Sequence, residues 1–143
     1  MGAARAAVNE CVRQLRARWS HVDLPHGPEA GGEARRNLRA ALAESGLPEH
    51  VVDDVLIVAG ELVVNAVDHG CPGVLGTIRM AWGFTPRHVV LRVVDAGTGP
   101  AFVEPEQEEA STRGRGLMMV DVICDDWAVD RGDATVVTAC IQR

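Results

Sequence analysis

Residues 48–69 read PEHVVDDVLIVAGELVVNAVDH and carry the clearest pattern in the chain. Apolar side chains recur there at the spacing of one broad helix face, namely at Val52, Val55, Leu56, Ala59, Leu62, Val63, Ala66 and Val67. Pro48 is a favoured first helical residue, and Gly70 and Pro72 end the pattern. The stretch therefore predicts a helix that covers a sheet with its apolar face.

The other side of this predicted helix carries polar residues: Asp54, Glu61, Asn65 and Asp68. A lone acidic residue in such a place is typical of a solvated helix face. Asn65 is different, because asparagine is a poor residue in the middle of a helix and has nothing to cap there. Glu61 and Asn65 lie one turn apart, so their side chains can jointly hold a water molecule or a hydrated magnesium ion.

Turn signals divide the rest of the chain into short elements. Working outward, we predict an edge strand (16–24), a helix (33–45), two strands (74–84 and 88–95), a long functional loop (96–116), a short helix (116–125) and two closing strands (127–130 and 134–141). This order favours an α/β protein of the α+β type, a two-layer sandwich with a mostly antiparallel sheet and helices on one face. Residues 1–15 are expected to form an N-terminal arm or helix, and 16–143 a single domain.

Composition excludes several classes of function. The 143 residues carry a net charge of −6, and all fourteen basic residues are arginine, so a Walker phosphate loop with its lysine is excluded. No basic stripe is present, which argues against direct binding of nucleic acid. The longest apolar run, Val55–Ala59, is far shorter than the roughly 18–20 residues of a membrane span. Residues 1–19 show no export signal, so we expect a cytoplasmic protein.

Cysteine and histidine give no metal motif. The four cysteines are Cys11, Cys71, Cys124 and Cys140, and none of them pair at the spacing of a zinc site. We expect free thiols.

A second informative stretch is Val93–Pro100, a hydrophobic strand that ends in Asp95 and continues into Gly97 and Gly99. A carboxylate at the end of a strand can accept a hydrogen bond from an amino group, and glycines let a flat ligand approach the backbone. Taken alone, this stretch is equally typical of a plain turn.

A third stretch is Arg113-Gly114-Arg115-Gly116-Leu117, which precedes a predicted helix. Glycine-rich backbone at a helix N-terminus presents N–H donors that bind phosphate, and the two arginines would strengthen that binding. A flexible linker is the alternative for so short a motif.

The three stretches, in this order, resemble those of the Bergerat-fold ATPases, the GHKL superfamily. The resemblance rests on Glu61 to His69, on Asp95-Ala96-Gly97-Thr98-Gly99 and on Gly114-Arg115-Gly116-Leu117. Within the superfamily the chain is most similar to bacterial anti-sigma factor serine/threonine kinases, which show a Val-Asp and a tryptophan soon after the last motif, here Val120-Asp121 and Trp127. The resemblance covers residues 16–141.

The resemblance implies a role for each matching residue. Glu61 would be the general base and Asn65 the magnesium ligand. Asp95 would bind the adenine amino group, with Thr135 supporting it. The remaining residues would line the purine pocket or meet the phosphates of ATP or ADP: Gly97, Gly99, Arg113, Gly114, Arg115, Gly116 and Leu117.

The chain departs from the family pattern in two places. Asp133 stands where the family often has lysine or glycine before the last strand. The predicted lid carries Glu106, Glu108 and Glu109, which we expect to point away from the nucleotide.

The resemblance implies an anti-sigma factor that holds a sigma factor inactive and phosphorylates a serine of a STAS-type anti-anti-sigma protein. It also implies a homodimer. Two alternatives remain: a regulatory module that binds nucleotide without phosphorylating its partner, and a detached sensor-kinase domain acting on histidine. The short predicted lid argues against the sensor kinase.

Overall fold

The computed structural model describes residues 2–16, 18–69, 76–95 and 112–143. In chain order the elements are α1 (Gly2–Leu15), β1 (Ser20–Pro25), α2 (Ala30–Leu42), α3 (Glu49–His69), β2 (Thr77–Phe84), β3 (His88–Asp95), α4 (Thr112–Ile123), β4 (Asp126–Arg131) and β5 (Thr135–Gln142). The predicted order of elements is confirmed.

The five strands form one sheet with the order β1-β2-β3-β5-β4, and every neighbouring pair is antiparallel. β1 and β4 are the edges, so the prediction of an edge strand that ends at Pro25 is confirmed. The α+β sandwich is therefore confirmed as well. β3 and β5, which carry Asp95 and Thr135, are central strands with neighbours on both sides.

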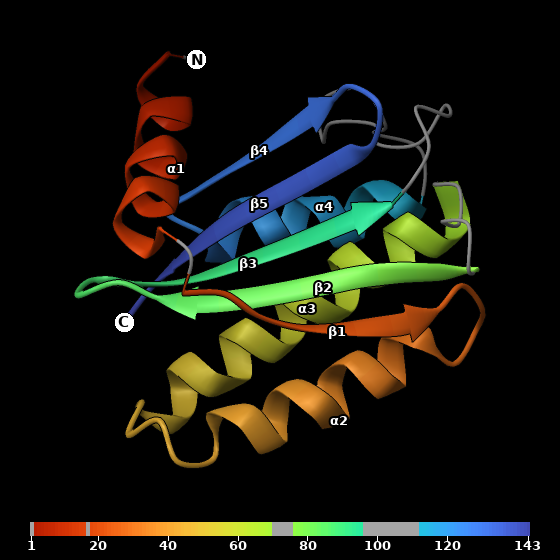
Figure 1. Ribbon diagram of the computed structural model, residues 1–143, viewed down its shortest axis with the longest axis horizontal. Helices are drawn as coiled ribbons and strands as arrows, with labels where there is room; N and C mark the ends of the chain where they lie inside the picture. Colours follow the sequence, from red (N-terminus) through yellow and green to blue (C-terminus); the bar gives the residue numbers. More distant parts are fainter. Residues whose placement is uncertain (1, 17, 70–75, 96–111) are drawn as a thin grey trace.

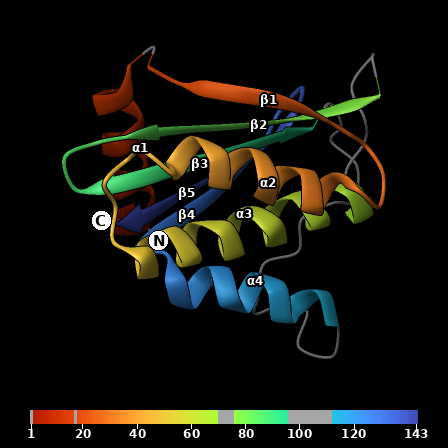
Figure 2. The ribbon, with the colours of Figure 1, turned by 90° about the horizontal axis from the view of Figure 1, so that it is seen from below.

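Helices α2, α3 and α4 cover one face of the sheet (Figures 1 and 2). The main core lies between these two layers, because alternate residues of each strand point toward the helices. The central strands contribute paired residues to this core, such as Leu91 opposite Ala139 and Val93 opposite Val137. Leu62 and Val63 of α3 are fully buried against it.

Helix α3 is buried over more of its circumference than its sequence pattern predicts. Val58 and Gly60, which lie outside the predicted apolar stripe, are buried together with Asn65. The reason is that α3 packs between α2 and α4 as well as on the sheet (Figure 2). Asn65, predicted to project from the side opposite the apolar stripe, is therefore buried by the neighbouring helices, whereas Asp68 is exposed as expected for a solvated acidic residue.

Helix α1 lies on the opposite face of the sheet, against β4 and β5 (Figure 1). A small second cluster of buried residues holds it there: Val8, Cys11 and Leu15 of α1 with Val90 and Cys140 of the sheet. The expectation of helices on one face thus applies to α2, α3 and α4 only. The sequence pattern did not indicate the position of α1, because its short apolar stripe fits either face.

Close packing at the C-terminal end of α1 depends on Gly83 of β2. A Cβ atom at this glycine would lie 2.5 Å from Leu15 Cδ2 and 3.0 Å from the carbonyl oxygen of Arg18. Nearby, the guanidinium of Arg92 lies over the ring of Trp19, 4.8 Å from its centroid, and its Nε donates to Thr138 Oγ1 at 3.1 Å. This face of the sheet is therefore held by specific contacts.

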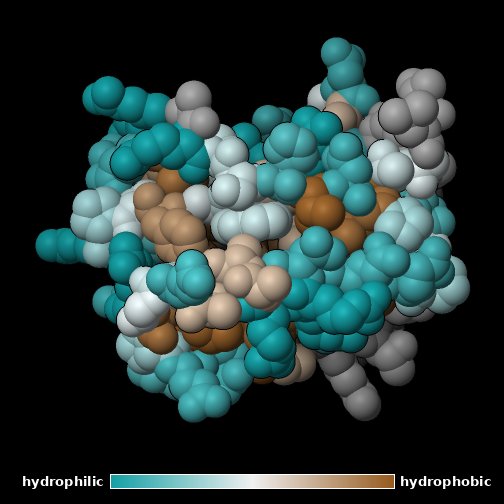
Figure 3. Space-filling model, turned by 60° about the horizontal axis from the view of Figure 1, so that its bottom comes forward, coloured by the Kyte–Doolittle hydropathy of each residue, from teal (hydrophilic) through white to brown (hydrophobic). Residues whose placement is uncertain are grey.

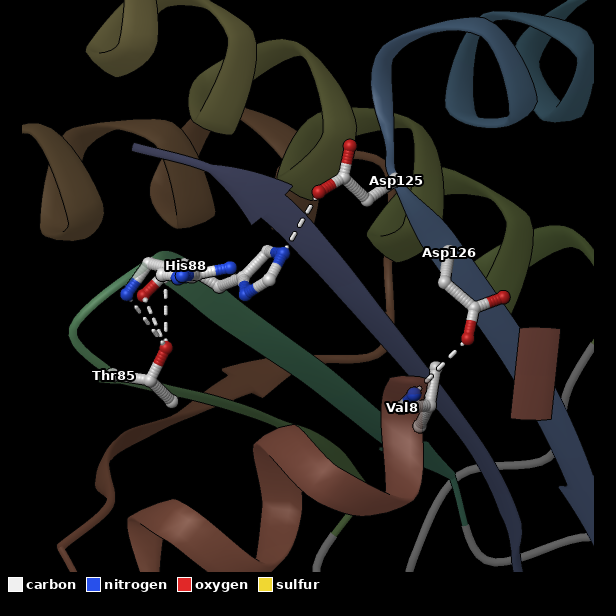
Figure 4. A network of polar contacts seen from close by, with 6 residues as sticks. Val8, Thr85, His88, Asp125 and Asp126 are labelled. Carbon is white, nitrogen blue, oxygen red and sulfur yellow. Dashed lines mark hydrogen bonds and ion pairs between the residues drawn. The ribbon is translucent and has the colours of Figure 1, made fainter. Parts of the chain in front are cut away.

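Polar contacts fix α1 to the start of β4 (Figure 4). The backbone N–H of Val8 donates to Asp126 Oδ2 at 3.0 Å. Oδ2 of the adjacent Asp125 lies 2.8 Å from Nε2 of His88. Burial raises the pKa of the Asp126 carboxyl, and the N–H groups of Val8 and Trp127 partly oppose that rise.

The thiols of Cys11, Cys124 and Cys140 are free and buried, and Cys71 lies outside the described residues. None of the described helices is long and apolar enough to cross a membrane.

Candidate functional site

Most of the predicted site residues converge at one end of the sheet. β3 ends there at Asp95, β5 begins there at Thr135, and the C-terminal end of α3 and the start of α4 lie beside them (Figure 1). The antiparallel pairing of β3 with β5 produces this convergence, since it brings the end of one strand to the start of the other.

Asp95 and Thr135 are directly paired across β3 and β5. Only 2 % of Asp95 and none of Thr135 is exposed, and both belong to the register that faces the helices. A buried carboxylate is stable only where hydrogen bonds compensate its desolvation. The pair thus provides a carboxylate and a hydroxyl that can recognise an amino group on a flat polar ligand.

Asn65 brings a buried amide to the same end of the molecule. Its side chain is 5 % exposed, and within the described part of the chain no group accepts a hydrogen bond from Nδ2. Leaving a buried donor unsatisfied costs about 1–3 kcal/mol, so native proteins retain such a group mainly for a purpose. Asn65 is therefore a candidate to hold a polar ligand or its metal ion.

His69 was missed as a site residue by reasoning from the sequence. It lies one turn after Asn65, at the end of α3, and its Nε2 is likewise buried without a partner among the described residues. His26, which follows β1, shows the same feature at Nε2. The one signal in the sequence was the spacing of Asn65 and His69, which places both on one side of a helix.

Glu61 occupies a different surface from Asn65, although one turn separates them. It is half-buried and lines a hollow of about 490 Å³ on the outer side of α3. The other lining residues are Arg35, Arg39, Asp53, Leu56, Ile57 and Met119, from α2, α3 and α4. A carboxylate in an open hollow is accessible to a partner molecule, whereas the amide of Asn65 faces inward.

The motif predicted to bind phosphate lies inside a helix. α4 begins at Thr112, so Arg113, Gly114, Arg115 and Gly116 belong to its first turns, and the prediction of a loop up to residue 116 is wrong. Threonine favours a helix start, and glycine costs least near a helix end, where few backbone bonds depend on it. The first N–H groups of α4 remain free of intrahelical partners and can still bind an anion.

Leu117 is 1 % exposed, so its side chain is buried beneath α4. The predicted purine-pocket residues Gly97 and Gly99 lie outside the described residues, as do the acidic residues Glu106, Glu108 and Glu109.

Comparison with known proteins identifies this arrangement. The profile of the family described as histidine kinase-like ATPase domain matches residues 24–141. No curated protein matches the chain.

Two solved structures share the fold. One is of the RsbU and RsbW domains of Rv1364c from Mycobacterium tuberculosis, with a TM-score of 0.65, 24 % identity and coverage of 87 % of this chain. This chain spans 33 % of that protein's chain. The other is of the SiaB-SiaC complex from Pseudomonas aeruginosa, with a TM-score of 0.64, 17 % identity and 98 % of both chains covered. At these identities the likeness concerns the fold alone.

Proposed function

The chain belongs to the family of histidine kinase-like ATPase domains, and from this membership we propose that it transfers the γ-phosphate of ATP to a serine of a partner protein. The partner we propose is a STAS-type anti-anti-sigma protein, with a sigma factor as the competing ligand. The observation that carries the proposal is the division on α3: Glu61 lines an outer hollow, whereas Asn65 is buried in the C-terminal part of the helix, which lies at the end of the sheet that carries Asp95 and Thr135 (Figure 1).

The buried end of the sheet suits a nucleotide. Asp95 would accept a hydrogen bond from the adenine amino group, and the hydroxyl of Thr135, its cross-strand partner, would support the same ring. The first N–H groups of α4 and the side chains of Arg113 and Arg115 would meet the phosphates. Burial of Asp95 excludes bulk water, which strengthens its hydrogen bond to the ligand.

The described residues suit a magnesium ion that is held by few protein ligands. They contain no group of three or more His, Cys, Asp or Glu side chains that could hold a metal ion by itself. Magnesium commonly takes one or two protein ligands and completes its shell with phosphates and water. We propose that Asn65 holds the ion through its amide oxygen, and that its buried Nδ2, which has no acceptor among the described residues, donates to a phosphate oxygen of the nucleotide. The ion would neutralise charge that develops on the phosphates.

Glu61 would act on the acceptor. Its carboxylate takes the proton of the serine hydroxyl as that oxygen bonds to the γ-phosphorus and the bond to the β-phosphate oxygen breaks. ADP and a phosphoserine are the products. A positioned base of this kind contributes on the order of 10²–10⁴ in rate.

The test is transfer of labelled γ-phosphate from ATP to purified STAS-domain proteins from the same genome. We expect label on a serine of one of them, and loss of most of the rate in Glu61→Gln with nucleotide affinity retained. Glu49→Gln, an exposed glutamate at the start of the same helix, is the matched control. Nucleotide binding without transfer to any of these proteins would identify a non-catalytic module, and would overturn the kinase proposal.

A further inference from the structure

Helix α4 exposes apolar side chains that its own packing does not require. Its inward residues Leu117 and Val120 are buried, as is Cys124 directly after the helix. On the outer side, Met118, Met119 and Val122 are 52 %, 43 % and 84 % exposed. A helix at the surface of a soluble domain normally carries polar residues on that side. An exposed apolar surface of this kind marks an interaction site.

These outer residues form a defined surface, which we call the α4 apolar face: Met118, Met119, Val122 and the half-buried Ile123. They line a shallow hollow of about 320 Å³, and none of the polar residues that the structure describes contributes to it. On the helical side of the molecule, Figure 3 shows hydrophobic side chains at the surface between hydrophilic ones. Methionine is suited to such a surface, because its flexible, polarizable side chain adapts to the shape of a partner.

The α4 apolar face is continuous with the hollow that contains Glu61. Met119 lines both, and Ile57 of α3, 38 % exposed, extends the apolar surface on the Glu61 side. A protein that brings a hydroxyl to Glu61 must lie over this second hollow, where it would also contact Met119. We propose that the α4 apolar face is the docking surface for the protein that carries the acceptor serine, an inference that rests on the function proposed above.

The opposite rim of the Glu61 hollow indicates the charge of that protein. Arg35 and Arg39 of α2 line it, and neither forms an ion pair with any residue that the structure describes. Gly60 lets Arg35 lie against α3, because a Cβ at this glycine would be 2.5 Å from Arg35 Nη1. An arginine without an ion-pair partner among the described residues can present its planar fork to a carboxylate. The partner should therefore combine an apolar contact surface with an acidic residue near its acceptor serine.

The apolar half of the proposal is tested with the double variant M118Q/V122Q. Both side chains are exposed, so the fold should tolerate the change. Binding to the STAS-domain acceptor is measured by calorimetry in a Glu61→Gln background with Mg-ADP. We expect binding about tenfold to hundredfold weaker, the effect of removing central apolar contacts from an interface. Phe84→Gln, at an exposed phenylalanine on β2, is the matched control and should bind normally.

The charged half is tested with Arg39→Glu. It should weaken acceptor binding and raise KM for the acceptor in the active protein, with kcat unchanged at saturation. Arg36→Glu, on the same helix but outside the hollow, should have no effect.

Three results with the M118Q/V122Q variant would overturn the docking proposal. The first is unchanged acceptor binding, and the second is a change in its mass in solution, which would assign the face to a second copy of the chain. The third is a large loss of thermal stability, which would mean that the chain itself covers the face. Failure of every STAS-domain protein to bind also overturns it. If one binds through this face but receives no phosphate, the docking surface stands and the kinase proposal fails.

Discussion

Asp95 at the end of β3 and Thr135 at the start of β5 face each other directly in the antiparallel sheet, and both are buried. Side chains of such a pair lie about 4.5–5.5 Å apart at Cβ, close enough to contact one ligand group together. On its other side Thr135 pairs with Arg131 of β4, so the ladder of β5 holds the pair in place.

Removal of the Asp95 carboxylate should weaken nucleotide binding. The lost hydrogen bond to a charged group is worth about 1.5–3 kcal/mol, or roughly 10-fold to 150-fold in Kd. Calorimetry with ADP on Asp95→Ala measures the loss, and Asp130→Ala, at an exposed aspartate of β4, is the control. Equal affinity in the two variants would contradict the adenine assignment.

Removal of the Thr135 hydroxyl should weaken nucleotide binding, whereas removal of a hydroxyl on the opposite face of the sheet should not. Thr135→Val should lower affinity for ADP by a neutral hydrogen bond, about 0.5–1.5 kcal/mol. Thr138→Val is a matched control on the same strand, because the Thr138 hydroxyl accepts a hydrogen bond from Arg92 on the opposite face. Thr138→Val should bind ADP normally, and a similar loss in both variants would indicate a general disturbance of β5.

Asn65 should govern the dependence on magnesium rather than nucleotide binding as such. Asn65→Ala removes the proposed ligand, so the gain in ATP affinity on adding magnesium should shrink, while affinity without the ion changes less. Titrations with and without EDTA measure both quantities. Asp68→Ala, at an exposed position of the same helix, is the control. An unchanged magnesium effect in Asn65→Ala would leave the amide with a structural role.

The parts of the fold that could be predicted are those in which one pattern extends over many residues. The predicted helix over 48–69 is observed as Glu49–His69, and the strand over 88–95 has its predicted bounds. Both follow from long apolar periods with clear stops. The pairing of Asp95 with Thr135 could not be predicted from their spacing in the sequence, because it depends on β3 and β5 being neighbours in the sheet.

Other features escaped prediction for identifiable reasons. The start of α4 at Thr112 was missed because Gly114 and Gly116 have low helix propensity and indicate a loop. The burial of Asn65 was missed because periodicity assumes one covered face, whereas α3 contacts α2 and α4 in addition to the sheet. The hollow beside Glu61 joins three helices, so no local pattern could reveal it.

Replacement of Asp126 by asparagine should change how stability depends on pH. Burial raises the pKa of this carboxyl above 3.8, so the folded protein retains the proton to higher pH than the unfolded chain does. In the wild type this contribution to the free energy of unfolding is present at low pH and is lost as pH rises through the folded pKa. Asp126→Asn keeps an oxygen for the Val8 N–H and removes the titration.

The variant should therefore gain stability relative to wild type between about pH 3 and pH 7, the range in which carboxyl groups titrate. Urea unfolding at a series of pH values measures this gain, with Asp130→Asn as an exposed control on the same strand. A stability difference that is constant across the series would contradict the raised pKa.

Gly83→Ala should destabilise the docking of α1. The added methyl would meet Leu15 and the backbone oxygen of Arg18, and the latter cannot move without moving the chain. Overpacking of this kind costs about 1–3 kcal/mol. Gly132→Ala, in the turn before β5, has nothing within 4 Å of the new Cβ and should change the free energy of unfolding by less than about 0.5 kcal/mol. Thermal unfolding of both variants measures the difference.

The hydrogen bond from Val8 to Asp126 joins residues 118 positions apart. Its consequence concerns the order of events as the chain is made. Helix α1 is synthesised before β4 and β5, yet these two strands provide the surface that receives it. Contacts of such long range can form only after the intervening chain has been made. Helix α1 must therefore wait for β4 and β5 before it reaches its place on the sheet.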